Sequence, residues 1–234
     1  MAERPVFISE ENKENLFKVE NIKFEWFPGF SASQKKKSVQ SLHENILKLH
    51  PDAKVLEVSS KSENELGIKL SAFNLMISTK KNISFSVEVA FQASKVFKNG
   101  GPYIDLYHKG SKEAKKDVRL KNSGPLTKFS YFGRDFPLEP KTLFYNWLYI
   151  NSLNLDSELN KQVLDYKYFT DIEFNPQKSI NCQAEAVSIY VSLCKNDLLK
   201  KALNSVENFE EIVYPSLKET TKKDIEQIEQ LKLL

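Results

Sequence analysis

The stretch from Pro140 to Ile150 limits the possible folds of this chain more than any other. It predicts a helix with Pro140 as its first residue, and the apolar side chains of this helix point to nearly all sides. Such a helix is stable in water only when other elements surround it, so we expect it at the centre of the molecule. Trp147, which lies within it, is expected to be a core residue.

The composition supports one packed domain around this helix. The chain has 234 residues, of which 41% are hydrophobic, and this content is enough for a sizeable core and excludes a disordered chain. No apolar run approaches the roughly 20 residues that cross a bilayer. The start, Met-Ala-Glu-Arg-Pro, lacks the pattern of a signal peptide. We therefore expect a cytoplasmic protein that has no contact with a membrane.

The apolar periodicities predict an α+β fold, a predominantly helical single domain with short strands and hairpins. We expect residues 1–60 to form an N-terminal extension packed on the body, residues 61–200 the core, and residues 201–234 a C-terminal helical tail. Within the core, residues 67–77 are expected to begin with a turn and become a buried strand, and residues 129–136 to form a hairpin that turns at Gly133-Arg134.

The stretch from Ser86 to Pro102 predicts a helix, which Ser86 caps and the Gly-Gly-Pro sequence at its end terminates. At 100° per residue, Glu88, Gln92 and Lys95 fall within one narrow stripe, opposite an apolar stripe. An acid, an amide and an amine therefore point the same way. This row is either an ordinary solvated face or one wall of a site.

Further polar side chains lie between Asp171 and Gln183. An alternating segment places the carboxylates of Asp171 and Glu173 on the same side. Asn181 and Gln183 lie near the N-terminus of a predicted helix, where free backbone N–H groups favour an anionic ligand such as pyrophosphate.

Two runs of basic residues are candidate contacts to nucleic-acid phosphate. The first is Lys35 to Lys37, and the second, here called the basic segment, is a probable helix over residues 111–122. The alternative is that both face water, with Glu113 and Asp117 balancing the basic segment. A net charge of +3 permits a polyanionic partner without requiring one.

The sequence predicts neither a metal nor a cofactor. Cys182 and Cys194 lie 12 residues apart without Cys-x-x-Cys spacing, and the three histidines do not form a ligand cluster. A Gly-rich phosphate loop and a nucleophile elbow are also absent from the sequence.

Several segments, in their order along the chain, resemble the NADAR (YbiA-like) family. These are Leu70-Ser-Ala-Phe-Asn74, Glu88-Val-Ala-Phe-Gln-Ala-Ser-Lys95, Pro137-Leu138, and Asp171-Ile-Glu-Phe-Asn175 followed by Asn181. In that family a Ser-Asn-Phe segment precedes a Ser-Glu-x-x-Phe-Gln-Ala-x-Lys helix, and a Lys-x-Asn run follows later.

From about Phe24 to about Leu193 the chain is most similar to the NADAR antitoxins that are paired with DarT-type DNA ADP-ribosyltransferase toxins. The resemblance implies a YbiA-like fold and an N-glycosidase that removes ADP-ribose from the exocyclic amino group of guanine in DNA. It implies three partners: ADP-ribosylated DNA, ADP-ribose as product, and a cognate DarT-type toxin. The family's Trp would fall near Thr142, so the resemblance assigns no role to Trp147.

The family's catalytic Glu, Lys and late Asp match Glu88, Lys95 and Asp171. We expect Glu88 to act as acid and base, Asp171 to orient water or the ribose hydroxyls, and Lys95 or Lys69 to supply an amine that captures the opened sugar. The residues expected to hold ADP-ribose, and to converge with these, are Ser71, Phe73, Asn74, Gln92, Glu173, Asn181 and Gln183.

Two other functions stay open at this point. One is a NADAR glycosidase that acts on a free metabolite, such as an N-glycoside of the riboflavin pathway. The other is a non-catalytic antitoxin that neutralises its toxin by binding it with the amphipathic tail from Leu217 to Leu234.

Overall fold

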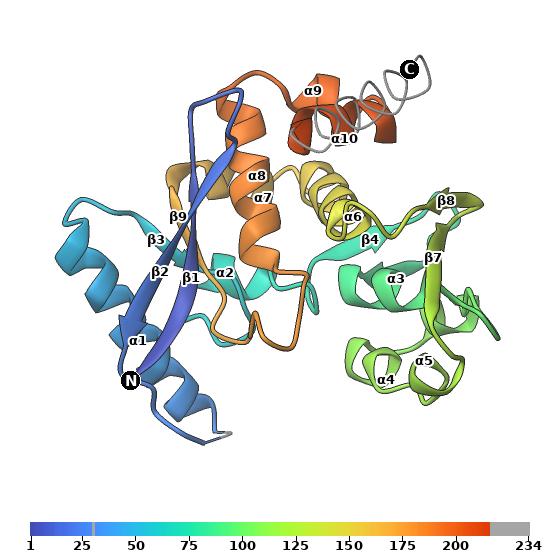
Figure 1. The fold of residues 1–234 in the computed structure, drawn as a ribbon, viewed down its shortest axis with the longest axis horizontal. Coiled ribbons are helices and arrows are strands. Elements are labelled where there is room, and N and C mark those ends of the chain that lie inside the picture. Colours follow the sequence, from blue (N-terminus) through green and yellow to red (C-terminus); the bar gives the residue numbers. More distant parts are fainter. Residues whose placement is uncertain (30, 216–234) are drawn as a thin grey trace, which may run out of the picture.

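The computed structural model describes residues 1–29 and 31–215, with helix α6, Leu143–Leu155, at the centre (Figure 1). Most side chains of α6 are buried, and helices α3, Val87–Ala93, and α8, Gln183–Lys195, pack against it. The predicted central helix is thus confirmed, although it begins at Leu143 because Thr142 takes the N-cap position. Trp147, expected in the core, is only half-buried and packs against Phe136 at the edge of the core.

A four-stranded sheet lies beside α8, and α1, Ala32–Leu49, covers it with its apolar face (Figure 1). β1 is antiparallel to both of its neighbours, whereas β3 is parallel to β9. The sequence analysis missed β1, which contains Pro5, but at Pro5 the strand has β2 as its one neighbour, a position where proline is tolerated. The strands in spatial order are β2 Phe17–Phe24, β1 Ala2–Ser9, β9 Tyr168–Thr170 and β3 Val55–Glu57.

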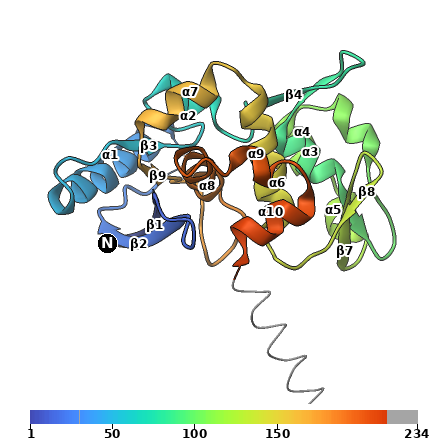
Figure 2. The ribbon, with the colours of Figure 1, turned by 90° about the horizontal axis from the view of Figure 1, so that it is seen from above.

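The end of the molecule away from α1 carries a hairpin and a three-stranded sheet (Figure 2). The hairpin consists of β4 Met76–Ser78 and β5 Ser84–Ser86, and the sheet of β6 Lys95–Phe97, β7 Leu126–Tyr131 and β8 Arg134–Phe136. The remaining elements are α2 Glu65–Lys69, η1 Ile104–His108, α4 Ser111–Lys115, α5 Arg119–Asn122, α7 Leu159–Gln162, η2 Val163–Asp165, α9 Leu199–Ala202 and α10 Val206–Val213.

The fold is a mixed α/β single domain. The expectation of a predominantly helical domain is not supported, because the described residues contain β1 to β9 in three sheets alongside the helices. In the part of the chain that the structure describes, no helix is both long and apolar enough to cross a membrane.

Two local predictions are wrong. Residues 67–77 are not mainly a strand, because the Asn64 side chain accepts a hydrogen bond from the N–H of Leu66 (2.9 Å) and begins α2 there. The helix predicted from Ser86 ends at Ala93, since the following residues pair with β7 instead. The hairpin expected within 129–136 is present, but its turn lies at Phe132-Gly133 and not at Gly133-Arg134, because Arg134 already pairs with Tyr131.

The predicted division of the chain at residues 60 and 200 stays a prediction. β1 and β3, from the expected N-terminal extension, pair with β9 from the expected core, and the two segments therefore share one sheet. Of the expected C-terminal tail, residues 216–234 lie outside the described residues.

Gly67 in α2 lies so close to neighbouring atoms that a Cβ added to it would sit 2.0 Å from the carbonyl oxygen of Glu57. We expect Gly67→Ala to lower the free energy of unfolding by about 1–3 kcal/mol, despite the higher helix propensity of alanine, because backbone atoms cannot move aside. Gly110→Ala, where nothing lies within 4 Å, should change it by less than about 1 kcal/mol. Urea titrations measure both, and equal effects would contradict the packing argument.

Candidate active site

A cavity of about 690 Å³, here called the site cavity, lies between α3, β7, the start of α8 and the loop that follows β9. Much of the predicted site lines it. The predicted residues at its surface are Phe73, Glu88, Gln92, Lys95, Asp171, Glu173, Asn181 and Gln183.

The first wall comes from α3 and the strand after it. The Ser86 hydroxyl caps α3 by accepting a hydrogen bond from the N–H of Val89 (3.2 Å), which places Glu88 in the first turn. The Glu88 carboxylate accepts a hydrogen bond from the Gln92 amide (2.9 Å), whose oxygen accepts one from Lys95 Nζ (2.8 Å). Acid, amide and amine are thus connected, although Lys95 begins β6 and is not on the helix as predicted.

Lys95 is a half-buried amine at the surface of the site cavity. Its Nζ lies 4.8 Å from the ring centre of Phe91. Burial lowers the pKa of Lys95; the charge of Glu88 opposes this shift and the charge of Lys115 adds to it. A lysine with a lowered pKa has a larger fraction of nucleophilic, uncharged amine.

Lys115 of α4 also reaches the site cavity. Its Nζ lies 3.6 Å from Glu88 Oε1 and 4.9 Å from the ring centre of Phe73. The sequence placed this residue only within the basic segment, because no sequence signal shows that α4 folds back beside α3. Lys115 therefore adds a cation next to the predicted acid.

The opposite wall is formed by Asp171 and Gln183. Asp171 Oδ1 accepts a hydrogen bond from the N–H of Glu173 (3.0 Å), and the Asp171 side chain also bonds to that of Gln183. Gln183 Oε1 accepts a hydrogen bond from the N–H of Ala72 (2.7 Å), while the Ala72 carbonyl accepts one from the N–H of Glu88 (2.8 Å). A single peptide segment thus connects both walls.

Behind Asp171 lies a second buried acid, Glu57 at the end of β3, which the sequence analysis did not identify. It accepts hydrogen bonds from the hydroxyls of Ser59 and Thr170 and from the N–H of Ile172 (2.9 Å). The signal that could have found it is the pairing of β3 with β9, which places Glu57 beside Thr170.

The two acids differ in how well each tolerates a negative charge. Burial raises the pKa of Asp171 well above its ordinary value of 3.8, and the charge of Glu57 adds to this. Burial also raises the pKa of Glu57, but hydrogen bonds from Ser59, Ile172 and Thr170 oppose that shift. Because three donors stabilise a Glu57 carboxylate, we infer that a proton held by this pair resides on Asp171.

The Glu57 network extends to α1. His43 Nε2 lies 2.9 Å from Thr170 Oγ1, and burial lowers the pKa of His43 to about 4, against the charge of Glu63. His43 is therefore neutral at pH 7 and adds no charge behind the site. Lys35, from the first basic run, pairs with Glu173 at the edge of the site cavity (3.3 Å).

Asn181 lies at the edge of the site cavity, just before α8. Its Oδ1 is buried and, among the described residues, has no hydrogen-bond partner. A buried polar atom without a partner is costly unless a ligand or water satisfies it. This observation fits the predicted ligand-binding role of Asn181.

Three predicted residues are not brought to the site cavity. Lys69 forms an ion pair with Glu65 on the exposed side of α2 (3.0 Å), which raises its pKa. The Asn74 side chain donates a hydrogen bond to the Ile68 carbonyl (2.8 Å), and Ser71 is buried below the turn. The expected convergence of Lys69 and Asn74 with Asp171 is therefore not found, and Ser71 and Asn74 shape the turn that carries Ala72.

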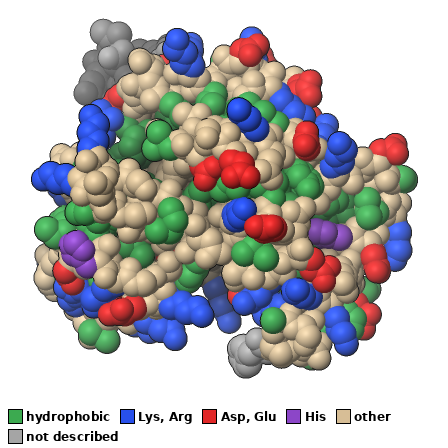
Figure 3. Space-filling model, turned by 180° about the vertical axis from the view of Figure 1, so that it is seen from behind, with side chains coloured by type: hydrophobic (Ala, Val, Ile, Leu, Met, Phe, Trp, Pro, Cys, Tyr) green, Lys and Arg blue, Asp and Glu red, His purple; other side chains and the backbone are tan. Residues whose placement is uncertain are grey.

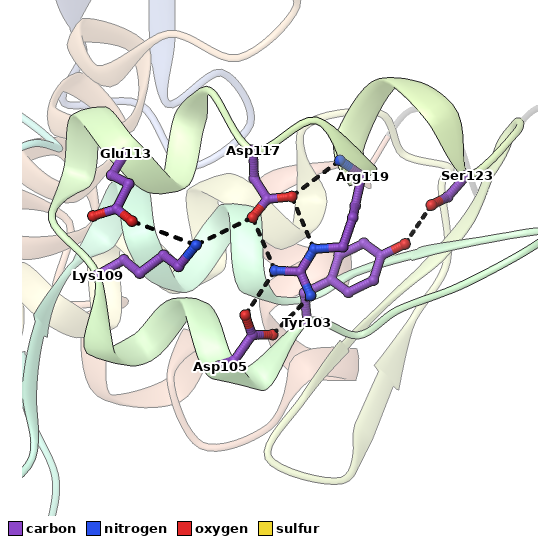
Figure 4. Close-up of polar contacts among 7 residues, drawn as sticks. All are labelled: Tyr103, Asp105, Lys109, Glu113, Asp117, Arg119 and Ser123. Atoms are coloured by element: carbon purple, nitrogen blue, oxygen red, sulfur yellow. Dashed lines mark hydrogen bonds and ion pairs between the residues drawn. The ribbon is translucent and has the colours of Figure 1, made fainter.

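The basic segment forms two short helices whose charges are partly neutralised (Figure 4). Arg119 binds both Asp105 (2.7 Å) and Asp117 (2.9 Å), and Lys109 lies between Glu113 (3.4 Å) and Asp117 (3.5 Å). These bonds hold the pKa of Asp117 below its ordinary range. For Arg119, the balanced-charge alternative describes the structure better than a free phosphate contact does.

The fold and the site cavity define a mixed α/β domain in which two acids from different elements face one large cavity. The model of the NADAR-DarT1 family, described as DarT1-associated NADAR antitoxins, matches residues 2–223, and the chain belongs to this family. No curated protein sequence matches the chain significantly. Among the described residues, no group of His, Cys, Asp and Glu side chains is arranged to hold a metal ion.

The protonated Asp171 makes stability depend on pH. Its pKa in the folded state is raised, so only below about pH 3 do both states hold the proton. As pH rises from there the unfolded chain loses it first, which lowers stability until the pH passes the raised pKa. Each unit of the raised pKa corresponds to about 1.4 kcal/mol. We expect Asp171→Asn to remove this loss. Between pH 4 and pH 8, the difference in free energy of unfolding between the variant and wild type should shift in favour of the variant by at least about 1 kcal/mol.

Asp52→Asn, at an exposed position, is the matched control and should follow the wild-type pH profile. Urea titrations at several pH values measure all three proteins. If the profiles of wild type and Asp171→Asn run parallel, Asp171 does not hold the proton.

Proposed function

We propose that the protein is an antitoxin-type N-glycosidase that hydrolyses ADP-ribose from the amino group of guanine in DNA and so reverses the action of a DarT-type toxin. Its membership of a family of DarT1-associated antitoxins supports the antitoxin role. The observation that carries the chemistry is the pair of acids on opposite walls of the site cavity, Glu88 beside a lysine and Asp171 in a buried setting that favours its protonated form.

Hydrolysis of a ribose C–N bond needs an acid and a base. The leaving nitrogen must take up a proton, and the water that attacks the anomeric carbon must lose one. We assign the proton donor to Asp171 and the base to Glu88, whose carboxylate lies 3.6 Å from Lys115 Nζ. The C–N bond breaks, a C–O bond forms, and the products are ADP-ribose and unmodified guanine.

The remaining groups of the site cavity suit a nucleotide ligand. Its volume of about 690 Å³ lies in the range of small-molecule sites. Asn181 offers an unused polar atom, and Gln92 lies between Glu88 and Lys95. Lysines 115, 141 and 178 at the surface of the cavity supply positive charge for the pyrophosphate or for DNA phosphates.

A covalent route would use Lys95. Its amine would add to C1 of the ring-opened ribose, which is joined to the guanine nitrogen as an imine. The C–N bond to guanine then breaks, guanine leaves with its amino group restored, and an imine to Lys95 remains. Water would later hydrolyse this imine and so release the aldehyde of ADP-ribose and the free amine. Of the two lysines expected for this role, Lys95 lines the site cavity and has a lowered pKa, whereas Lys69 lies outside.

The assignment of Glu88 is tested by Glu88→Gln, which keeps the size of the side chain but removes the base. We expect the rate of ADP-ribose release from ADP-ribosylated guanine DNA to fall by at least about 100-fold. Thermal melting and calorimetric binding of ADP-ribose should remain close to wild type. Glu113→Gln in α4, whose carboxylate pairs with Lys109 away from the cavity, is the control and should retain full activity.

Borohydride added during turnover tests the covalent route. We expect it to trap an adduct on Lys95, identified by peptide mass spectrometry, and Lys95→Arg should abolish this adduct while Lys69→Arg should not. A fully active enzyme that yields no adduct would leave hydrolysis through Asp171 and Glu88 as the route.

The same assays separate the two other functions. An enzyme of free metabolites would release ADP-ribose from a modified nucleoside faster than from modified DNA. If the protein is a non-catalytic antitoxin, the Glu88→Gln variant should protect against the toxin as well as wild type does. The tail from Leu217 to Leu234, expected to carry such binding, lies outside the described residues.

A further inference from the structure

A second cavity, of about 520 Å³, lies across β7 from the site cavity. Phe129 lines the site cavity, and the next residue, Ser130, lines the second one, because neighbouring residues of a strand point to opposite faces. Hydrophobic side chains gather beside a histidine and several basic side chains at the end of the molecule away from α1 (Figure 3).

Three aromatic rings make one wall of this second cavity, here called the platform cavity. The ring centres of Phe85 and Tyr107 lie 4.4 Å apart, and Phe132 is stacked on Tyr107 with centres 5.5 Å apart and planes 16° from parallel. Phe132 is 64% exposed and Ile104 beside it 67% exposed. Apolar surface exposed in this way marks a binding surface more often than a structural one.

The backbone at Phe132 is an independent indication of function. Phe132 and Gly133 are the two turn residues between β7 and β8, and both have positive φ, 47° and 82°. Asn, Asp and Gly suit such a turn, whereas a phenylalanine there costs stability. An exposed ring on a strained backbone adds little to the stability of the fold. We therefore expect the ring of Phe132 to contact a ligand.

The charged side chains that line the platform cavity, Lys80 and Lys81, are positive. His108 also lines the cavity, and none of the described residues that line it is acidic. Stacked aromatic rings with lysines around them are the usual means by which proteins hold unpaired bases and their phosphates. A protein partner offering an acidic peptide would not use the stacked rings.

We propose that the platform cavity binds an unpaired base of single-stranded DNA, with Phe132 stacking on the base and Lys80 and Lys81 contacting its phosphates. The proposal rests on the proposed function in taking DNA as the substrate, and it adds a second place where the DNA strand is held, outside the site cavity. Because the two cavities lie on opposite sides of β7, the bound base lies beyond the modified nucleotide, and a modified mononucleoside does not reach it.

The test measures binding of a fluorescent, unmodified oligonucleotide of about 20 thymidines by anisotropy. Phe132→Asn removes the ring and suits the turn, so we expect its Kd to rise by roughly 5- to 100-fold with no loss of thermal stability. Lys80→Ser combined with Lys81→Ser should reduce the dependence of log Kd on log salt by about 0.7 for each lost phosphate contact. Leu155→Asn, an exposed apolar residue at the end of α6, is the control and should bind like wild type.

The oligonucleotide carries no ADP-ribose, so this measurement is independent of glycosidase activity. A protein that binds the oligonucleotide but lacks hydrolysis would overturn only the proposed function. The platform proposal fails if wild type does not bind the oligonucleotide, if duplex DNA of the same length binds equally well, or if Phe132→Asn and the lysine variant bind like wild type. Loss of toxin binding in Phe132→Asn with unchanged DNA binding would instead assign the surface to a protein partner.

Discussion

The turn that carries Ala72 holds the candidate site together. The carbonyl of Ala72 accepts a hydrogen bond from the N–H of Glu88 at the start of α3. The N–H of Ala72 donates one to Gln183 at the start of α8. Two residues earlier, the Leu70 carbonyl accepts a hydrogen bond from the Tyr149 hydroxyl of the central helix α6. Three helices thus meet one short turn, and the distance between the two acid walls depends on it. This explains why Ser71 and Asn74, which do not line the cavity, belong to the same sequence motif as residues that do.

Buried acids are the second feature on which the site depends. An isolated buried carboxylate is costly, and three hydrogen-bond donors offset part of that cost for Glu57. Asp171 has fewer donors and lies next to Glu57, so its protonated form is favoured. When two carboxyl groups in one cavity have different environments, one can stay protonated while the other is ionised. The first can then donate a proton and the second can accept one. Here the sheet provides that difference, since β3 and β9 bring Glu57 behind Asp171.

Sequence patterns predicted the elements whose side chains show a clear period. The central helix and the capped start of α3 were predicted, because apolar periodicity and a serine cap are local signals. The end of α3 was not, because pairing of Lys95 with β7 is a contact between distant residues that overrides helical spacing. Lys95 nevertheless reaches Gln92, so the predicted row of acid, amide and amine exists with a different backbone beneath it.

The identity of the chemical groups, an acid and an amine near Glu88 and Lys95 and a second acid at Asp171, follows from the residues themselves and from their family resemblance. Their neighbours do not follow from it. Lys115 reaches Glu88 because α4 folds back on α3, and Lys69 points away because α2 turns its charged side to solvent. The raised pKa of Asp171 likewise comes first from burial and then from the charge of Glu57, which a strand more than a hundred residues away in the chain brings near it. Local spacing dictates which side chains are available, whereas burial and long-range contacts dictate their charge and partners, because both depend on the packed fold.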